Sequence, residues 1–212
     1  MKKLDYKVIA SGSSGNAVRI ENIMIDCGIP YKYMKEELYK VDFLLITHDH
    51  SDHVNKTTLK HIVKDFPNIK IYSTYKVARI NENVVAINTD YLPIWLKDCE
   101  MYAVEVPHNT ITFAYILLLP GHNVLYATDL RQTDELEKFT EEKHLKYDYM
   151  FLEANYDDYK LEGVKNEWHG QYNAYIDSTS RHLSKDQSLK CYIKYKTERG
   201  EYIELHKSKR FY

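Results

Sequence analysis

The stretch from Thr47 to His53, which reads THDHSDH, restricts the possible folds more than any other part of the sequence. It contains three histidines and two aspartates within seven positions, and it follows directly on the apolar run of residues 43–46. A short apolar run bounded by polar residues is typical of a buried strand. Strand ends are rigid points from which polar side chains can converge, so we expect a sheet with a polar cluster at one edge.

The side chains of this stretch are those that bind divalent metal ions. Imidazole nitrogens and carboxylate oxygens suit zinc and manganese. If residues 47–50 are extended, alternation places His48 and His50 on the same side, while Asp52 and His53 follow a bend and can serve a second ion. A solvated loop that collects polar residues by chance is the alternative, since the chain has ten histidines among 212 residues. The pattern H-x-H-x-D-H behind a strand favours two metal ions.

Length and composition favour one domain over residues 1–212. The apolar content is 44%, and no linker rich in Pro, Gly or Ser divides the chain. The formal charge of -2 and the pI near 6.6 exclude electrostatic binding of nucleic acid over the whole protein surface, but they allow a local basic patch.

The cysteine content and the N-terminal residues predict where the protein resides. Cys27, Cys99 and Cys191 are widely separated and odd in number, so a reducing compartment, the cytoplasm, fits better than a disulfide framework. We expect neither an export signal nor a membrane span, because no apolar run is long enough. Nothing in the sequence requires a protein partner.

Strand and helix signals alternate along much of the chain. Runs of strands with helices interposed predict an α/β protein with two mixed sheets and helices packed outside. Strands are expected at 5–11, 17–21, 23–26, 41–46, 69–73, 100–106, 111–119, 123–128, 148–153 and 201–205, and helices at 31–40, 56–65, 133–143, 169–178 and 185–197; residues 75–98 have no clear pattern. His108, Asp129 and His206 each follow a later strand, so we expect them to meet His48 at one edge.

These motifs together resemble the metallo-β-lactamase superfamily. The matching segments are THDHSDH, VPHN with His108, ATDL with Asp129 and IELHKS with His206. Within the superfamily the chain is similar to a bacterial and phage branch, the WalJ-like (YycJ-like) hydrolases, through SGSSGNA, IDCG, LEANYD and RHLS. The resemblance implies an αββα four-layer sandwich with a binuclear site at the sheet edge.

The same resemblance implies a role for each matched residue. Asp26 would support the metal loop through hydrogen bonds, and Asp52 would also hold and orient the attacking hydroxide. Two divalent ions, Zn²⁺ or Mn²⁺, would be held as follows: His48, His50 and His108 on one ion, Asp52, His53 and His206 on the other, and Asp129 as the bridge between them.

Two histidines near the end of the chain compete for the last ligand position. His206 follows an expected strand that ends at the site edge, whereas His182 precedes a helix whose N-terminal N–H groups favour an anion. We therefore assign His206 as the ligand and His182 as a phosphate contact or as the acid that protonates the leaving oxygen.

The substrate contacts are less well defined by the sequence. Ser13, Ser14 and Asn16 lie in a Gly-Ser segment that can cradle a phosphate or simply form a turn. Glu153 and Asn155 follow a strand and can either contact substrate or cap the next helix. The chain also departs from the GHLSN pattern of the resembling branch, because Arg181 precedes His182; such a cation would favour a polyanion, or it is solvated surface.

The sequence thus predicts a binuclear metal-dependent phosphodiesterase that acts on nucleic acid, a nuclease or exonuclease in which a metal-bridging hydroxide attacks phosphorus. Its partner would be nucleic acid or another phosphodiester substrate. Two other interpretations remain open. The same site could cleave a thioester or lactone, as in glyoxalase II, or the chain could be a non-catalytic metal-binding module.

Overall fold

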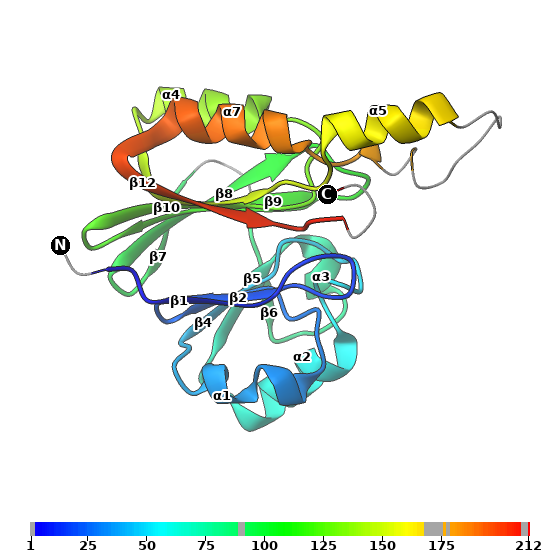
Figure 1. Ribbon diagram of the computed structural model, residues 1–212. Coiled ribbons are helices and arrows are strands. Elements are labelled where there is room, and N and C mark those ends of the chain that lie inside the picture. Colours follow the sequence, from blue (N-terminus) through cyan, green and yellow to red (C-terminus); the bar gives the residue numbers. More distant parts are fainter. Residues whose placement is uncertain (1–2, 89–91, 168–175, 177–178, 209–211) are drawn as a thin grey trace. The chain divides into compact units, whose positions relative to one another are not determined.

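The structure of the protein is a computed structural model that describes residues 3–88, 92–167, 176, 179–208 and 212. The chain divides into two compact units, Met1–Leu92 and Pro93–Tyr212. Each unit is built on one six-stranded sheet (Figure 1). The single domain expected over residues 1–212 stays a prediction.

The sheet of the first unit has the strand order β1-β2-β3-β4-β5-β6. Its first three strands form an antiparallel meander, and the parallel strands β4, β5 and β6 follow. The sheet is therefore mixed, as predicted. The strands are β1 (Tyr6–Ala10), β2 (Ala17–Ile20), β3 (Ile23–Ile25), β4 (Phe43–Leu45), β5 (Lys70–Ser73) and β6 (Val84–Ala86).

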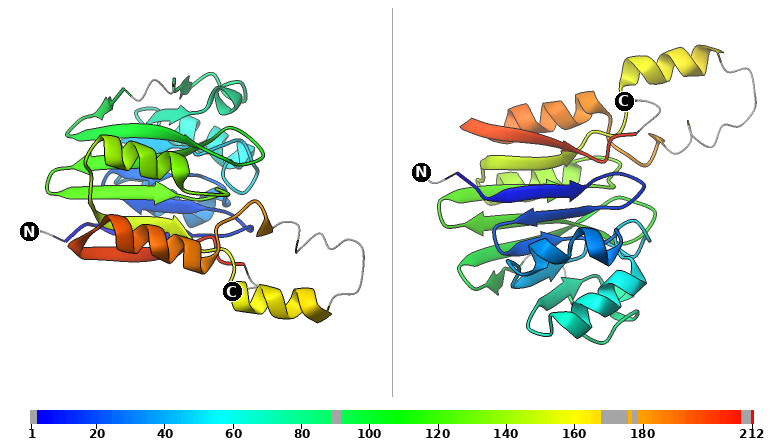
Figure 2. Two further views of the ribbon diagram at one scale, coloured as in Figure 1. Left: turned by 90° about the horizontal axis from the view of Figure 1, so that it is seen from above. Right: turned by 60° about the horizontal axis from the view of Figure 1, so that its bottom comes forward.

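Short helices cover one face of this sheet, as the second view of Figure 2 shows. They are the 3-10 helix η1 (Tyr31–Tyr33), α1 (Lys35–Leu38), α2 (Lys56–Asp65) and α3 (Tyr75–Ala78). The start of α2 is fixed by Asn55, whose side chain accepts hydrogen bonds from the N–H groups of Thr57 and Thr58, both at 3.1 Å. Leu59 and Ile62 of α2 enter the core of the unit.

The sheet of the second unit has the strand order β12-β11-β10-β9-β8-β7. Strands β7 to β10 are antiparallel, and β11 and β12 continue in parallel from β10. This sheet is also mixed. The strands are β7 (Ile94–Leu96), β8 (Cys99–Val106), β9 (Thr112–Leu119), β10 (His122–Ala127), β11 (Tyr147–Glu153) and β12 (Lys196–Leu205).

Two helices, α4 (Asp134–Glu142) and α7 (Lys185–Tyr195), lie along one face of the second sheet, while α5 (Asp158–Glu167) extends beyond it (Figures 1 and 2). Phe139 of α4 and Cys191 of α7 enter the core of this unit. Helix α7 begins with a capping box in which Ser184 and Gln187 bond to each other's backbone N–H groups, so its first turn has a defined position.

Most of the expected elements are present. The helix expected at 31–40 is divided into η1 and α1, and the strand expected at 201–205 begins at Lys196. Four elements have no counterpart among those expected: α3, β6, β7 and α5. The helix expected at 169–178 lies almost entirely outside the described residues. In the hairpin between β9 and β10, Leu119 pairs with His122, so the turn consists of Pro120 and Gly121 alone.

Candidate metal centre

The THDHSDH loop follows β4, and Asp26 at the end of β3 holds its start. Because β3 and β4 are parallel neighbours, the backbone N–H of Asp26 bonds to the carbonyl of Leu45 at 2.8 Å, which brings Asp26 beside Thr47. Oδ1 of Asp26 then accepts hydrogen bonds from the backbone N–H of Thr47 at 2.8 Å and from its hydroxyl at 2.9 Å. Asp26 adopts the left-handed conformation with φ of 62°, which turns the chain out of the strand.

Asp26 and Thr47 also fix which nitrogen of each neighbouring imidazole carries the proton. Oδ2 of Asp26 lies 2.7 Å from Nδ1 of His53, and the hydroxyl oxygen of Thr47 lies 3.0 Å from Nδ1 of His48. A carboxylate only accepts, and the Thr47 hydroxyl already donates to Asp26, so both Nδ1 atoms carry the proton. Nε2 of His48 and of His53 therefore carries the lone pair that a metal ion requires.

The donor atoms of the loop form two close pairs. Nε2 of His48 lies 3.0 Å from Nδ1 of His50, and Nε2 of His53 lies 3.6 Å from Oδ2 of Asp52. Two donors on one tetrahedral zinc ion, each about 2.1 Å from the metal, are about 3.4 Å apart. Each pair thus has a spacing close to that of two donors on one ion, and the assignment of the two pairs to two different ions stays a prediction.

The Gly-Ser segment packs against this loop through Asn16. The backbone N–H of Asn16 bonds to the carbonyl of Asp52 at 2.7 Å, and its side-chain Nδ2 lies 3.0 Å from Nε2 of His53. Gly28 also packs directly against the loop. A Cβ at this position would lie 1.7 Å from the carbonyl oxygen of Asp52. Asn16 is fully buried, whereas Ser13 and Ser14 are exposed, so only the two serines can meet a ligand from solvent without rearrangement.

The second unit has its own cluster, centred on Asp129. Asp129 follows β10, His108 follows β8 and His206 follows β12. Oδ1 of Asp129 lies 3.9 Å from Nε2 of His108, while Oδ2 lies 3.6 Å from Nε2 of His206. Oδ1 also lies 3.7 Å from Nδ1 of His182, so the carboxylate faces three histidines, and its role as a bridge between two ions stays a prediction.

Glu153, at the buried end of β11, connects the two competing histidines. Its Oε1 lies 2.6 Å from Nδ1 of His182 and 3.0 Å from Nδ1 of His206, and its Oε2 accepts from the backbone N–H of Leu130 at 3.1 Å. Donor atoms of Asp129, Glu153, His182 and His206 all lie within 4.8 Å of one another, a grouping that could hold a metal ion. Sequence reasoning considers Glu153 only as a substrate contact or helix cap.

Charge stabilises this buried cluster. Burial lowers the pKa of His182, but the charge and hydrogen bond of Glu153, together with the charge of Asp129, outweigh burial and raise the pKa above its ordinary value. Burial likewise opposes ionisation of Glu153, yet the charge and hydrogen bonds of His182 and His206 hold its pKa below the usual range. The cluster therefore favours an ionised Glu153 beside a protonated His182.

Asn155 also contacts His206 rather than solvent. Its Nδ2 donates to the carbonyl oxygen of His206 at 2.8 Å and lies 3.2 Å from Nδ1 of the same residue. Asn155 is 9% exposed. Its contacts in the structure position a candidate ligand, and a direct contact with substrate stays a prediction.

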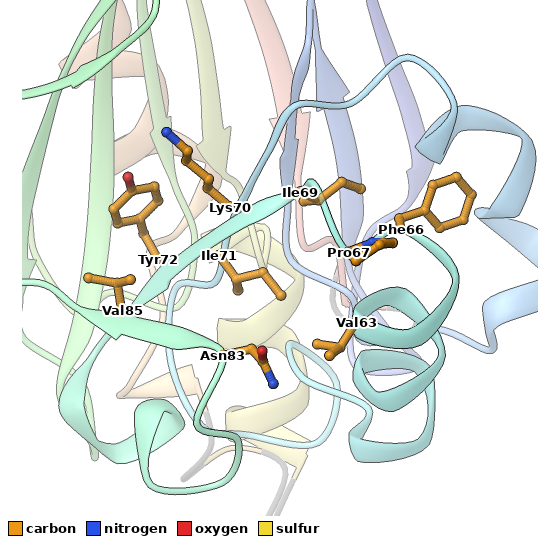
Figure 3. A pocket seen from close by; sticks show the side chains of 9 residues that line it. All are labelled: Val63, Phe66, Pro67, Ile69, Lys70, Ile71, Tyr72, Asn83 and Val85. Atoms are coloured by element: carbon orange, nitrogen blue, oxygen red, sulfur yellow. The ribbon is translucent and has the colours of Figure 1, made fainter.

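An apolar hollow of the first unit lies elsewhere, between α2 and the strands β5 and β6 (Figure 3). Its volume is about 380 Å³, and its lining includes Val63, Phe66 and Ile71. The candidate ligands are not among its lining residues. No helix among the described residues is both long and apolar enough to cross a lipid bilayer.

Comparison with known proteins identifies the fold. The profile of a family described as Beta-lactamase superfamily domain matches residues 21–199. The metallo-β-lactamase fold protein YhfI from Bacillus subtilis has a TM-score of 0.71 and 15% identity, over 96% of this chain and 85% of that one. A comparison with curated protein sequences finds no significant match.

Two further solved structures are similar over nearly the whole chain. The short form of human tRNase Z has a TM-score of 0.66 and 16% identity, over 97% of this chain and 93% of that one. A diphosphatase from the PhnP family has a TM-score of 0.66 and 17% identity, over 97% and 87%. At these identities the likeness shows the fold, and the predicted class of two mixed sheets with helices is confirmed.

Proposed function

The chain belongs to the metallo-β-lactamase superfamily, and from this premise we propose that it is a metal-dependent phosphodiesterase that acts on nucleic acid, as a nuclease or exonuclease. Two neighbours in structure support a phosphate substrate by their names, one being a tRNase and the other a diphosphatase. The WalJ-like branch and a cytoplasmic location belong to the same proposal. Three buried cysteines outside any disulfide are consistent with that location.

We propose that the chain holds two divalent ions, zinc or manganese. The ligands are His48, His50 and His108 for one ion, Asp52, His53 and His206 for the other, and Asp129 for both. The donor pairs of the THDHSDH loop and the two-sided contacts of Asp129 support this assignment. When bound, such ions lower the pKa of water and neutralise charge that develops on a phosphoryl oxygen.

The observation that carries the proposal is the shared hydrogen bonding of Glu153 to two histidines. One of them, His206, directs Nε2 towards Asp129, which would place both side chains around one ion. The other, His182, is stacked on it with ring centroids 5.2 Å apart and is favoured in the protonated form by Glu153. A protonated imidazole can bind a phosphate oxygen or donate its proton to the departing alkoxide, which is the step that phosphodiester cleavage needs.

The remaining residues orient these groups. Asp52 places its carboxylate beside His53, where it would hold the attacking nucleophile in line with phosphorus. Ser13 and Ser14, which are exposed beside the loop, and Asn155, which bonds to His206, are proposed substrate contacts. The pair of tail histidines favours a phosphodiester over a thioester, because an alkoxide leaving group benefits more from protonation than a thiolate.

The test uses wild type and His50→Ala, each supplied with zinc or manganese. The substrates are bis(p-nitrophenyl) phosphate and single- and double-stranded DNA and RNA, labelled at the 5′ or the 3′ end. We expect wild type to cleave and His50→Ala to lose activity by at least about 100-fold. His61→Ala, which changes an exposed histidine on α2, is the matched control. Thioester or lactone turnover without cleavage of any phosphodiester would overturn the proposal.

A further inference from the structure

Arg181 occupies a particular position in the second unit. It directly precedes His182, in the turn that leads to α7. Neighbouring Cα atoms are about 3.8 Å apart, so the long side chain of Arg181 starts beside that of His182.

The guanidinium of Arg181 is only partly solvated. Its Nε is shielded from solvent and has no hydrogen-bond partner among the residues that the structure describes. Arg19, the buried arginine of the first unit, is different: its guanidinium bonds to Glu37 at 2.8 Å, to Asp5 at 2.9 Å and to the carbonyl of Glu21 at 2.8 Å. Removing a cation from water is costly unless an anion or acceptor compensates, and Arg19 has such compensation.

Glu153, the carboxylate that bonds to the neighbouring His182, is already engaged, because it accepts from His182 and from His206. An external anion would therefore supply the missing acceptor. A guanidinium matches the geometry of phosphate, because two of its N–H groups can bond to two oxygens of one phosphate at the same time.

We propose that Arg181 binds the phosphate adjacent to the one that is cleaved, and so makes the site selective for polynucleotides over substrates with a single phosphate. The inference rests on the proposed function and names the substrate feature that it recognises. His182 addresses the phosphate under attack, and Arg181 addresses its neighbour along the strand. A phosphodiester with one phosphate satisfies only the first of these two groups.

The first experiment measures kcat and KM of wild type, Arg181→Met and Arg181→Lys on a single-stranded oligonucleotide and on bis(p-nitrophenyl) phosphate. We expect Arg181→Met to raise KM for the oligonucleotide about 10-fold, and to affect kcat/KM for the oligonucleotide far more than that for the small substrate. Arg181→Lys keeps the charge but lacks the planar guanidinium, so its KM for the oligonucleotide should lie between those of wild type and Arg181→Met. Equal losses on both substrates would overturn the inference, because Arg181 would then act at the cleaved phosphate.

The second experiment measures binding without turnover. Fluorescence anisotropy with a labelled phosphorothioate oligonucleotide gives the affinity at several salt concentrations. Each phosphate contact contributes about one counterion to the salt dependence, so Arg181→Met should lower the slope by about one and Arg181→Lys should retain it. The matched control is Arg199→Met, which changes an exposed arginine in the early part of β12, several residues from His206.

Thermal unfolding separates recognition from a structural role. Because Arg181 lacks a described partner for Nε, methionine of similar length should leave the melting temperature of the ligand-free protein unchanged or raise it. A fall of several degrees in Arg181→Met would show that the guanidinium holds the turn, and would overturn the inference. If wild type cleaves bis(p-nitrophenyl) phosphate but Arg181→Met binds the oligonucleotide normally, the inference fails while the proposed function stands. If wild type cleaves no phosphodiester, the proposed function fails.

Discussion

Replacement of Glu153 by glutamine tests the positioning of the two histidines of the second unit. The substitution preserves shape and volume but replaces one carboxylate oxygen by an NH₂ group. In the native protein Glu153 accepts from Nδ1 of His182 at 2.6 Å and from Nδ1 of His206 at 3.0 Å. Because the glutamine side chain is uncharged and carries a donor in place of one acceptor, His206 would no longer be held with its proton on Nδ1 and its lone pair on Nε2.

The magnitude follows from the hydrogen bonds that are weakened. A hydrogen bond to a charged group contributes about 1.5–3 kcal/mol, and loss of a partner behind a metal-ligating histidine reduces metal affinity about 10- to 100-fold. Glu153 makes two such bonds and is fully buried, so solvent cannot replace them. We expect the affinity for the metal ion on the His206 side to fall about 100-fold. The loss of the protonated form of His182 should reduce kcat further.

The assay is competition with a chromophoric chelator, which gives metal affinities without any substrate. Glu142→Gln, which changes an exposed residue at the last position of α4, removes the same charge thirteen residues after Asp129 and should leave both affinities unchanged. Circular dichroism establishes that Glu153→Gln is folded. Native metal affinity in a folded Glu153→Gln protein would refute the reasoning, because Nδ1 contacts would then have no influence on His206.

Two further predictions concern the first unit. Hydrogen bonds from Lys7 and Arg19 lower the pKa of Glu37 to about 2. Glu37→Gln should therefore reduce the free energy of unfolding by about 1–2 kcal/mol at pH 7, a value that is discounted because the Lys7–Glu37 pair is partly solvated. This deficit should shrink as the pH falls from 4.5 towards 2, and urea titrations that find it independent of pH contradict the prediction. Gly28→Ala should displace the metal loop, since its Cβ would lie 1.7 Å from the carbonyl oxygen of Asp52. We expect a loss of about 3 kcal/mol in stability and weaker metal binding, and unchanged values would exclude the close approach.

The elements that sequence predicts well are those with strong local signals. Helix α2 has the expected bounds, because Asn55 caps its start and Leu59 and Ile62 repeat at helical spacing. The elements between residues 75 and 98 lack such a signal, since α3, β6 and β7 have only three or four residues each, too few for a periodic pattern. Helix α5 escapes prediction because its start depends on the Asp157 side chain, which accepts from two N–H groups, rather than on an apolar repeat.

Long-range strand pairing explains what local patterns could not predict. Lys196 to Tyr202 has no strong strand pattern at its start, yet pairing of Lys196 with Tyr147 extends β12 to ten residues. After a register shift between Tyr147 and Tyr149, the parallel pairing joins Glu153 to Leu205, and thereby brings Glu153 beside His206. Spacing in the sequence identifies the candidate histidines, but the role of the carboxylate that bonds to two of them depends on this register, which no local pattern reveals.

Both units use one arrangement to fix the tautomer of a candidate ligand histidine. In the first unit Asp26 accepts from Nδ1 of His53, and in the second Glu153 accepts from Nδ1 of His206, so the lone pair resides on Nε2 in each case. His50 is the exception, because its Nδ1 is the atom that lies 3.0 Å from Nε2 of His48. A carboxylate bonded to Nδ1 of His50 would block the very atom expected to bind metal. The tautomers of His53 and His206 are therefore set by the protein before any ion arrives, which lowers the cost of reorganisation on binding.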